Sequence, residues 1–377
     1  MRNIQRRALQ LLSAIALVAT LTALTGCQNF FVCQKASCPA SGSGGTGTDD
    51  FLYVTNSSTG STYLNAYNLS AGTLVAVSGS PFNLSFIPSA LVVNPANTLM
   101  FAASQTGGIY AYAISSAGVL SSQNSGSAVS VDSAGAMAVS PDGKYLFVLN
   151  TTAMDEFSIG TNGALTLVSQ SNFLALGITA AVTPAAIQVA PSADFVVCAL
   201  GTAGNVFFPF NTSTGLISAG TINTPVLPTN GDNGVAIDSN NFAYISQTNG
   251  LLVYSVNAST GVPSLLAASP YTTGSGPRPV VVNKAGTYVY VGNYGDSTIS
   301  AFKIGTSGAL TPLTSVQSGP SNVNTLAADN TGSYLLAGGY GATGIQLLQT
   351  SATTGALTSA QTAASGTSGV TLLAVTH

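Results

Sequence analysis

The sequence predicts an all-β protein, a seven-bladed β-propeller built from four-stranded blades. Three observations support this fold: a β-hairpin pattern that recurs along the chain, a second signal in each repeat centred on a glycine, and chain ends that complement each other. The clearest hairpin is MAVSPDGKYLFVLN, residues 137–150, in which two apolar runs flank Ser-Pro-Asp-Gly. Proline presets φ at the first corner of such a turn, and glycine accepts a positive φ at the second.

The hairpin pattern is the repeating unit of the chain. Five further copies lie at residues 91–104, 187–200, 235–247, 280–293 and 326–339. A second signal of the repeat is a glycine followed by a short apolar stretch. It occurs seven times, at intervals of 45 to 52 residues: Gly72, Gly118, Gly163, Gly215, Gly261, Gly308 and Gly355. A four-stranded unit repeated every ~40–50 residues is typical of β-propellers.

The two ends of the propeller region each hold part of one hairpin. FLYVTN, residues 51–56, has the pattern of a second strand without a first, and GVTLLAVTH, residues 369–377, that of a first strand without a second. We therefore expect the C-terminal strand to join the N-terminal blade and close the ring. This closure explains why seven glycine signals accompany six hairpins, and it predicts a propeller over residues 51–377.

The composition excludes some classes of protein. Charged residues make up 5% of the chain, against roughly 25% in ordinary globular proteins. After residue 26 no apolar run approaches the ~18–20 residues of a membrane-spanning helix. From Cys27 onward 11 acidic residues face five scattered basic ones, Lys35, Lys144, Arg278, Lys284 and Lys303. Without a basic cluster, nucleic acid is not an expected partner.

The N-terminal residues 1–26 have the form of a secretory signal, with a basic start and an apolar centre. The tetrapeptide Leu24-Thr25-Gly26-Cys27 resembles the bacterial lipobox, which implies cleavage before Cys27 and a lipid anchor on its sulfur; a plain signal peptide is the alternative. Residues 27–50 form a Gly/Ser-rich tether. We expect an exported protein, anchored to the membrane through Cys27 and facing the periplasm or the cell exterior.

The other cysteines carry less information. Cys33 and Cys38 could close a small disulfide loop in an oxidising compartment, and their Cys-x4-Cys spacing without a second pair argues against zinc. Cys198 lies in the apolar run DFVVCAL and is expected to be a buried hydrophobic residue.

The repeats resemble a known family. FLYVTN and YVYVGN are similar to the YVTN class of bacterial propeller repeats, and residues 51–377 are similar to the lactonase-like propellers, including 6-phosphogluconolactonases of this type and muconate-cyclising enzymes. The best matching stretches are residues 274–304 and 183–210. Arg278 matches the family's Gly-Pro-Arg-His turn. The polar positions of the family pattern are replaced at Ala185, Ala199, Pro279 and Tyr294.

Lactone hydrolysis needs a base to activate water and donors to hold the oxyanion. The single histidine of the chain is the terminal His377, which we expect to be solvated. In a propeller, the loops that enter the inner strands share one face with the loops between second and third strands. We therefore predict that Arg278, Asp232 and Asp132 meet Asn293 and Tyr294 at the mouth of the channel.

Arg278 is the one arginine outside the signal peptide and is a natural carboxylate clamp. The alternative for it is an ordinary ion pair with Asp232 or Asp296. Asp155-Glu156 is the one pair of adjacent acids in the blades, and we expect it at a solvated strand start rather than in a catalytic pair.

Asp142 and Asp329 are expected in turns. The segments GDNG and NYGDST are too sparse in oxygen ligands for a calcium loop. We predict no metal and no cofactor.

These observations favour an envelope lipoprotein with a lactonase-like propeller. Its expected role is that of a non-catalytic binding or scaffolding module that contacts a small molecule, glycan or protein at the channel face. The alternative is a lactonase acting on a sugar lactone, with Arg278 and a carboxylate base such as Asp232 as catalytic candidates.

Overall fold

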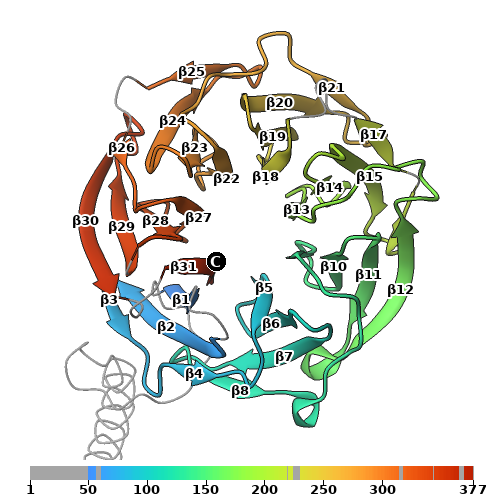
Figure 1. The fold of residues 1–377 in the computed structure, drawn as a ribbon, viewed down its shortest axis with the longest axis vertical. Coiled ribbons are helices and arrows are strands. Elements are labelled where there is room, and N and C mark those ends of the chain that lie inside the picture. Colours follow the sequence, from blue (N-terminus) through green and yellow to red (C-terminus); the bar gives the residue numbers. More distant parts are fainter. Residues whose placement is uncertain are drawn as a thin grey trace, which may run out of the picture. The chain divides into compact units, whose positions relative to one another are not determined.

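The computed structural model of the protein describes residues 50–56, 61–218, 220–223, 230–313, 317–342, 344–364 and 369–376. The predicted signal peptide, Cys27, Cys33, Cys38, the tether up to residue 49 and His377 lie outside these residues. The described part forms a ring of seven antiparallel sheets around a central axis (Figure 1). The predicted all-β, seven-bladed architecture is therefore confirmed.

Each sheet is one blade, and its strands run from the axis outward. The first blade combines both ends of the chain: β31 (Val370–Val375), β1 (Asp50–Asn56), β2 (Tyr63–Ser70) and β3 (Thr73–Ala76). The second blade is β5 (Pro88–Val93), β6 (Leu99–Ser104), β7 (Ile109–Ile114) and β8 (Leu120–Ser122). The third blade is β9 (Ala136–Val139), β10 (Tyr145–Leu149), β11 (Ala153–Ile159) and β12 (Leu165–Asn172).

The remaining four blades follow the same order. The fourth blade is β13 (Ala186–Val189), β14 (Phe195–Ala199), β15 (Asn205–Asn211) and β16 (Leu216–Ile217), and the fifth is β18 (Asp232–Ile237), β19 (Phe242–Gln247), β20 (Gly250–Val256) and β21 (Pro263–Leu265). The sixth blade is β22 (Pro277–Val282), β23 (Tyr288–Asn293), β24 (Thr298–Ile304) and β25 (Leu310–Pro312). The seventh blade is β27 (Val323–Ala328), β28 (Tyr334–Gly339), β29 (Gly344–Thr350) and β30 (Leu357–Ala364). The short strands β4 (Phe82–Asn83), β17 (Thr221–Asn223) and β26 (Gln317–Ser318) pair with third strands.

The ring closes where the two ends of the chain meet. Strand β31 pairs antiparallel with β1, with Leu52 opposite Val375 and Tyr53 opposite Ala374. The Phe51 amide donates to Thr376 Oγ1 at 2.8 Å, and the Thr376 amide donates to the Phe51 carbonyl at 3.0 Å. The predicted closure by the C-terminal strand is confirmed, and it gives β1 a hydrogen-bonded neighbour on both sides.

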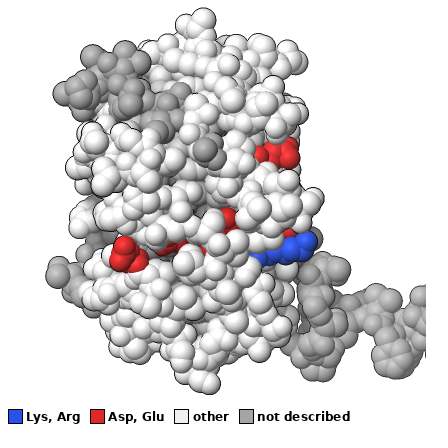
Figure 2. Space-filling view, turned by 90° about the vertical axis from the view of Figure 1, so that its right-hand side faces the viewer, with Lys and Arg blue, Asp and Glu red and all other residues white. Residues whose placement is uncertain are grey.

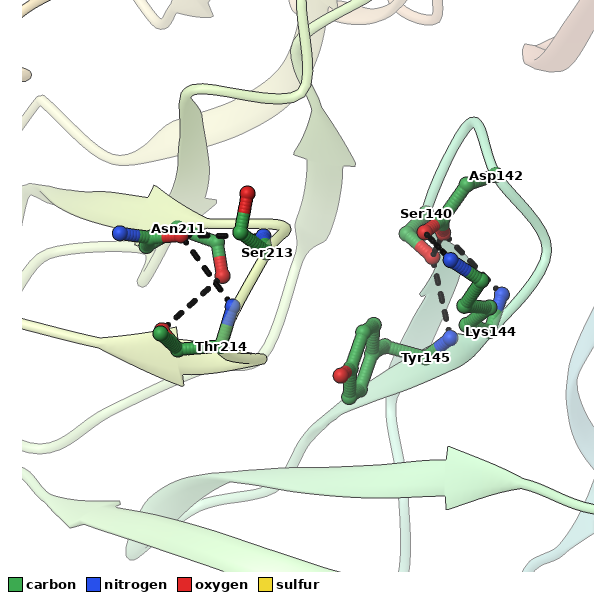
Figure 3. A network of polar contacts seen from close by, with 7 residues as sticks. All are labelled: Ser140, Asp142, Lys144, Tyr145, Asn211, Ser213 and Thr214. Atoms are coloured by element: carbon green, nitrogen blue, oxygen red, sulfur yellow. Dashed lines mark hydrogen bonds and ion pairs between the residues drawn. The ribbon is translucent and has the colours of Figure 1, made fainter.

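A polar residue at the end of the inner strand organises most of the repeated hairpins. In the Ser-Pro-Asp-Gly turn, the Tyr145 amide donates to Ser140 Oγ at 3.0 Å, and Ser140 Oγ donates to Asp142 Oδ1 at 2.6 Å (Figure 3). Lys144 adds an ion pair with Asp142 at 3.4 Å. Backbone amides donate in the same way to the side chains of Asn94, Asp238, Asn283 and Asp329. Asp142 and Asp329 therefore serve turns, as predicted.

The seven repeat glycines lie where one blade contacts the next. All of them have φ between +65° and +77°. A Cβ on Gly215, which follows the turn that Asn211 caps in Figure 3, would fall on the ring of Tyr145 in the preceding blade. Glycine is required here both by the positive φ and by the close approach of the ring.

The hydrophobic core is divided among the spaces between neighbouring blades. Phe147 on β10 and Phe208 on β15 are fully buried in one such cluster, while Phe207 and Ile245 are buried in the next. Tyr53 donates its hydroxyl across a blade boundary to the Gly118 carbonyl at 2.9 Å. No helix within the described residues has the length and apolar character needed to cross a membrane.

Candidate functional site

A cavity of about 510 Å³ lies on the propeller axis, among the innermost strands. Apolar side chains form part of its wall, among them Leu91, Val235, Val280, Leu326 and Leu373. The polar lining residues are Thr183, Asn233, Arg278, Asn324, Thr325 and Thr371. Its volume falls within the range of ~300–1,000 Å³ that is usual for small-molecule sites.

Four of the polar residues form what we term the channel girdle: Asn233, Arg278, Asn324 and Thr371. They occupy equivalent positions near the start of four consecutive inner strands, β18, β22, β27 and β31. Hydrogen bonds connect the girdle from blade to blade. Asn233 Nδ2 donates to the Pro277 carbonyl at 3.1 Å, and Asn324 Nδ2 donates to the Thr371 carbonyl at 3.1 Å. The girdle is thus a continuous arc of amide and hydroxyl groups around one side of the cavity.

Arg278 supplies the positive charge of the girdle. Its guanidinium carbon lies 3.7 Å from the centroid of the Tyr294 ring, and its Nη1 donates to Asn324 Oδ1 at 3.3 Å. Within the described residues Arg278 forms no ion pair, so the alternative of a pair with Asp232 or Asp296 is not realised. Two neighbours therefore orient the side chain while its charge stays uncompensated at an exposed position.

Asp232 does not reach the cavity, although its neighbour Asn233 does. Its side chain is fully buried, where it accepts hydrogen bonds from Asn205 Nδ2 at 2.8 Å and Gln247 Nε2 at 2.5 Å. The register of β18 with β19 shifts between Asp232 and Gly234. Burial raises the pKa of the Asp232 carboxyl to about 6, although the two hydrogen bonds act to lower it.

The other predicted mouth residues hold loops in place. Asn293 is fully buried, and its Nδ2 donates to Thr298 Oγ1 and Ser300 Oγ at 2.9 Å each. Asp132 is exposed and accepts a long hydrogen bond of 3.4 Å from Thr152 Oγ1. Of the five candidates for the channel mouth, Arg278 alone lines the cavity. Tyr294 contacts Arg278 from outside the cavity lining.

The adjacent acids Asp155 and Glu156 are not at a solvated strand start, contrary to expectation. Both lie in β11, where they are 4% and 0% exposed. Asp155 accepts from Gln170 Nε2 at 2.7 Å and Asn150 Nδ2 at 3.0 Å, whereas Glu156 accepts from Ser169 Oγ at 2.6 Å. Burial raises the pKa of both carboxyl groups. They are internal polar groups of the third blade.

Sequence reasoning missed three members of the girdle, Asn233, Asn324 and Thr371. A signal for them exists in the repeat itself, because each lies one repeat away from the next. Arg278 and Asn324 are 46 residues apart, and Asn324 and Thr371 are 47 apart. Aligning the repeats on Arg278 identifies these positions.

The outer side of the propeller carries few charges. Figure 2 shows a side of the propeller on which uncharged residues predominate and acidic or basic side chains are scattered. Among the described residues, no three histidine, cysteine or acidic side chains gather in a group that could hold a metal ion. The charge of Arg278 is therefore the main electrostatic feature of the cavity lining.

The fold and the axial cavity define the class: a seven-bladed β-propeller with a cavity at the centre of the ring. The family model for the lactonases, described as a 7-bladed beta-propeller, matches residues 137–323 and 243–372, which together span more than half of the chain. The chain belongs to this lactonase family. No curated protein matches it in sequence.

Solved structures share the fold at low sequence identity. A candidate 6-phosphogluconolactonase of Bacteroides fragilis has a TM-score of 0.71 at 16% identity, covering 90% of this chain and 100% of its own. Another, from Bacteroides uniformis, has a TM-score of 0.73 at 16% identity, covering 87% and 99%. A periplasmic gluconolactonase of Pseudomonas aeruginosa has a TM-score of 0.70 at 16% identity, covering 87% and 99%.

Proposed function

We propose that this protein is a non-catalytic binding module whose axial cavity holds a small hydroxylated carboxylic acid. The observation that carries the proposal is the state of Arg278, which is oriented by Tyr294 and Asn324 and has no acidic partner among the described residues. A guanidinium held in this way is a ready partner for a carboxylate, to which it can donate two parallel hydrogen bonds.

The rest of the cavity suits the remainder of such a ligand. The girdle residues Asn233, Asn324 and Thr371 offer amide and hydroxyl groups to ligand hydroxyls, and apolar side chains cover the wall. A few convergent polar groups in a partly apolar cavity are the usual arrangement of a small-molecule site. A sugar acid combines both kinds of group in one molecule.

The hydrogen bonds of Asp232 favour binding without turnover. A hydrolase requires a base within hydrogen-bond reach of the attacking water. Asp232 is the closest carboxylate in sequence to the girdle, and amides of Asn205 and Gln247 bind its two oxygens. Apart from Arg278 and Gly234, the described cavity lining consists of residues with apolar, amide or hydroxyl side chains, and it holds no carboxylate.

We also propose that the module works outside the cytoplasm. The signal-like residues 1–26 and the lipobox at Cys27 support export and lipid anchoring. One structure with the same fold is named a periplasmic gluconolactonase. Acyl chains on Cys27 would tether the propeller to the membrane, each buried CH₂ contributing about 0.8 kcal/mol.

Lactone hydrolysis is the second candidate function. Membership in the lactonase family favours it, and Arg278 would then stabilise the oxyanion that forms as water attacks the lactone. Asp232, with its pKa raised to about 6, would have to leave its two amide partners to act as the base.

The two functions are separated by calorimetry and a hydrolysis assay on the same protein. We expect glucuronate and gluconate to bind, glucose to bind much more weakly, and glucono-δ-lactone to persist at its uncatalysed rate. Arg278→Gln should abolish binding of both acids. The matched control is Lys303→Gln, which removes an exposed cation from the far end of β24. It should leave binding intact.

If the wild-type protein accelerates loss of the lactone, both Arg278→Gln and Asp232→Asn are assayed in protein that still unfolds cooperatively. Loss of the activity in both variants would replace the binding proposal with the hydrolase. Absence of acid binding to the wild-type chain would refute the binding proposal directly.

A further inference from the structure

Two tyrosines occupy the same turn in adjacent blades. Tyr294 follows β23 and Tyr340 follows β28, each in the turn between the second and third strand. Tyr340 is 52% exposed, and Tyr294 is partly exposed. At the equivalent turns of four other blades, the sequence has Gln105, Thr151, Gly201 and Thr248. Aromatic side chains at this position are thus concentrated in two neighbouring blades.

Asn322 holds the two tyrosines next to each other. Its Nδ2 donates to the Tyr294 carbonyl at 3.0 Å, and its own carbonyl accepts the Tyr340 amide at 3.0 Å. We term Tyr294, Asn322 and Tyr340 the mouth strip. Because one residue bonds to the backbone of both tyrosines, the two turns that carry them are held together.

The mouth strip continues directly from the channel girdle. Asn322 lies two residues before Asn324, a step of about 7 Å in extended chain, and the Tyr294 ring lies on the Arg278 guanidinium. Arg278 and Tyr294 belong to the blade of β22–β25 and Tyr340 to the next blade, so the path from Arg278 through Tyr294 and Asn322 to Tyr340 crosses a blade boundary. A ligand that follows it would place its acid on Arg278 and its distal part on Tyr340.

The chemistry of the strip fits sugar rings. A pyranose presents C–H groups on one face, which pack on the face of an aromatic ring, and hydroxyls at its edge, which pair with amides. Tyrosine suits such a half-wet position because its ring is apolar and its hydroxyl remains hydrated. The strip itself has no charged side chain, so it favours neutral rings over further acids.

We infer that the ligand class is an acidic oligosaccharide, with its acidic residue on Arg278 and neutral sugar rings along the mouth strip. The inference rests on the proposed function, because it uses Arg278 as the carboxylate site. It assigns Tyr340 as a specificity-determining residue that a single sugar acid does not reach.

The test is calorimetry on the full chain with three probes: glucuronate, glucuronosyl-xylobiose (one acid and two neutral rings) and neutral xylotriose. We expect glucuronosyl-xylobiose to bind about tenfold more tightly than glucuronate and xylotriose to bind most weakly. Tyr340→Ala should weaken glucuronosyl-xylobiose about threefold to tenfold, the size of a lost aromatic contact, and leave glucuronate unchanged. Tyr340→Phe should retain wild-type affinity, which separates ring stacking from misfolding.

Val262→Ala serves as the surface control, because Val262 is 48% exposed in the turn between the third and fourth strands, at the other end of its blade. The inference fails while the proposed function stands if glucuronate binds through Arg278 but chain length and Tyr340→Ala have no effect. Both fail if no acid binds. Equal affinity for xylotriose and glucuronosyl-xylobiose would also overturn the inference, because the acid would then contribute nothing.

Discussion

Gly72 packs against the hydroxyl end of Tyr334, and this contact joins the first blade of the propeller to the last. The same contact between a repeat glycine and the preceding blade recurs around the ring, for example between Gly118 and Phe51 and between Gly355 and Tyr288. A feature visible in the sequence as a periodic glycine is therefore an element of blade packing.

Substituting Gly72 by alanine should destabilise the protein more than an ordinary glycine substitution. Gly72 has φ +77°, and its added Cβ would overlap the Tyr334 side chain. Positive φ costs an alanine about 1–2 kcal/mol, and overpacking adds about 1–3 kcal/mol. Gly177→Ala is the matched control, since Gly177 has φ +90° with nothing within 4 Å of an added Cβ. If both variants lose the same free energy of unfolding, measured in urea, the contact between Gly72 and Tyr334 does not contribute to stability.

Stability should fall as the pH rises from about 4 to about 6. Burial raises the pKa of Asp232 to about 6, above the ~3.9 of an unfolded aspartate. In that window the native state holds a proton that the unfolded state has lost, so each rise in pH disfavours the native state. The full effect of this group is on the order of 2–3 kcal/mol. Asp155 and Glu156, whose pKa burial also raises, act with the same sign.

Asp232→Asn should flatten this dependence without removing it, as measured by urea unfolding across the pH range. Asp142→Asn is the control, because the pKa of Asp142 is shifted in the opposite direction from that of Asp232. Burial acts to raise the pKa of Asp142, but hydrogen bonds from Ser140 and Lys144 outweigh it and leave that pKa below its ordinary value. If Asp232→Asn leaves the pH dependence of the unfolding free energy unchanged, Asp232 is ionised over the whole range from about pH 4 to about pH 6.

Cys198 should resist alkylation in the folded protein. Its thiol is fully buried, with Sγ 3.6 Å from Met154 Sδ, and burial raises its pKa. The thiolate is the reactive form, so iodoacetamide at about pH 8 should label Cys198 much more slowly in the native protein than in protein unfolded in urea. Peptide-resolved mass spectrometry measures this. Labelling of Cys198 without urea, as fast as in urea, would contradict the structure.

Tyr294 should act on the ligand through Arg278. Replacing it with leucine removes the ring from under the guanidinium, and affinity for glucuronate should fall about twofold to fivefold, the range for an exposed cation–π contact. Tyr294→Phe keeps the ring and should bind as the wild type does. If leucine and phenylalanine behave alike in calorimetry, the 3.7 Å contact does not position Arg278 for binding.

The fold was readable from the sequence because each blade repeats the same local chemistry. The seven glycines, the hairpin turn at Ser140–Gly143 and the half-hairpins at the two ends of the propeller region are local patterns, and the structure confirms the ring that they predict. Turn residues and strand alternation act over a few positions, so a single sequence reveals them.

The site was only partly readable, because side-chain direction depends on small irregularities. Arg278 and Tyr294 are in contact, but of the two only Arg278 lines the cavity. Asp232 was expected beside them, but the register shift after it accompanies an inward-facing Asn233 and a buried carboxylate. Nothing in the letters Gly-Asp-Asn-Gly distinguishes these two outcomes. The burial of Asp155 and Glu156 was missed for a related reason: amide and hydroxyl partners on neighbouring strands, such as Gln170 and Ser169, make buried acids tolerable.

Pairing of β31 with β1 also sets an order of events during biosynthesis. The strand that completes the first blade leaves the ribosome more than 310 positions after its partner, as the separation of 325 between Phe51 and Thr376 illustrates. Until then β1 has an open inner edge, and the circle cannot shut. In a chain that crosses a membrane during synthesis, the complete ring would therefore form only after β31 has crossed as well.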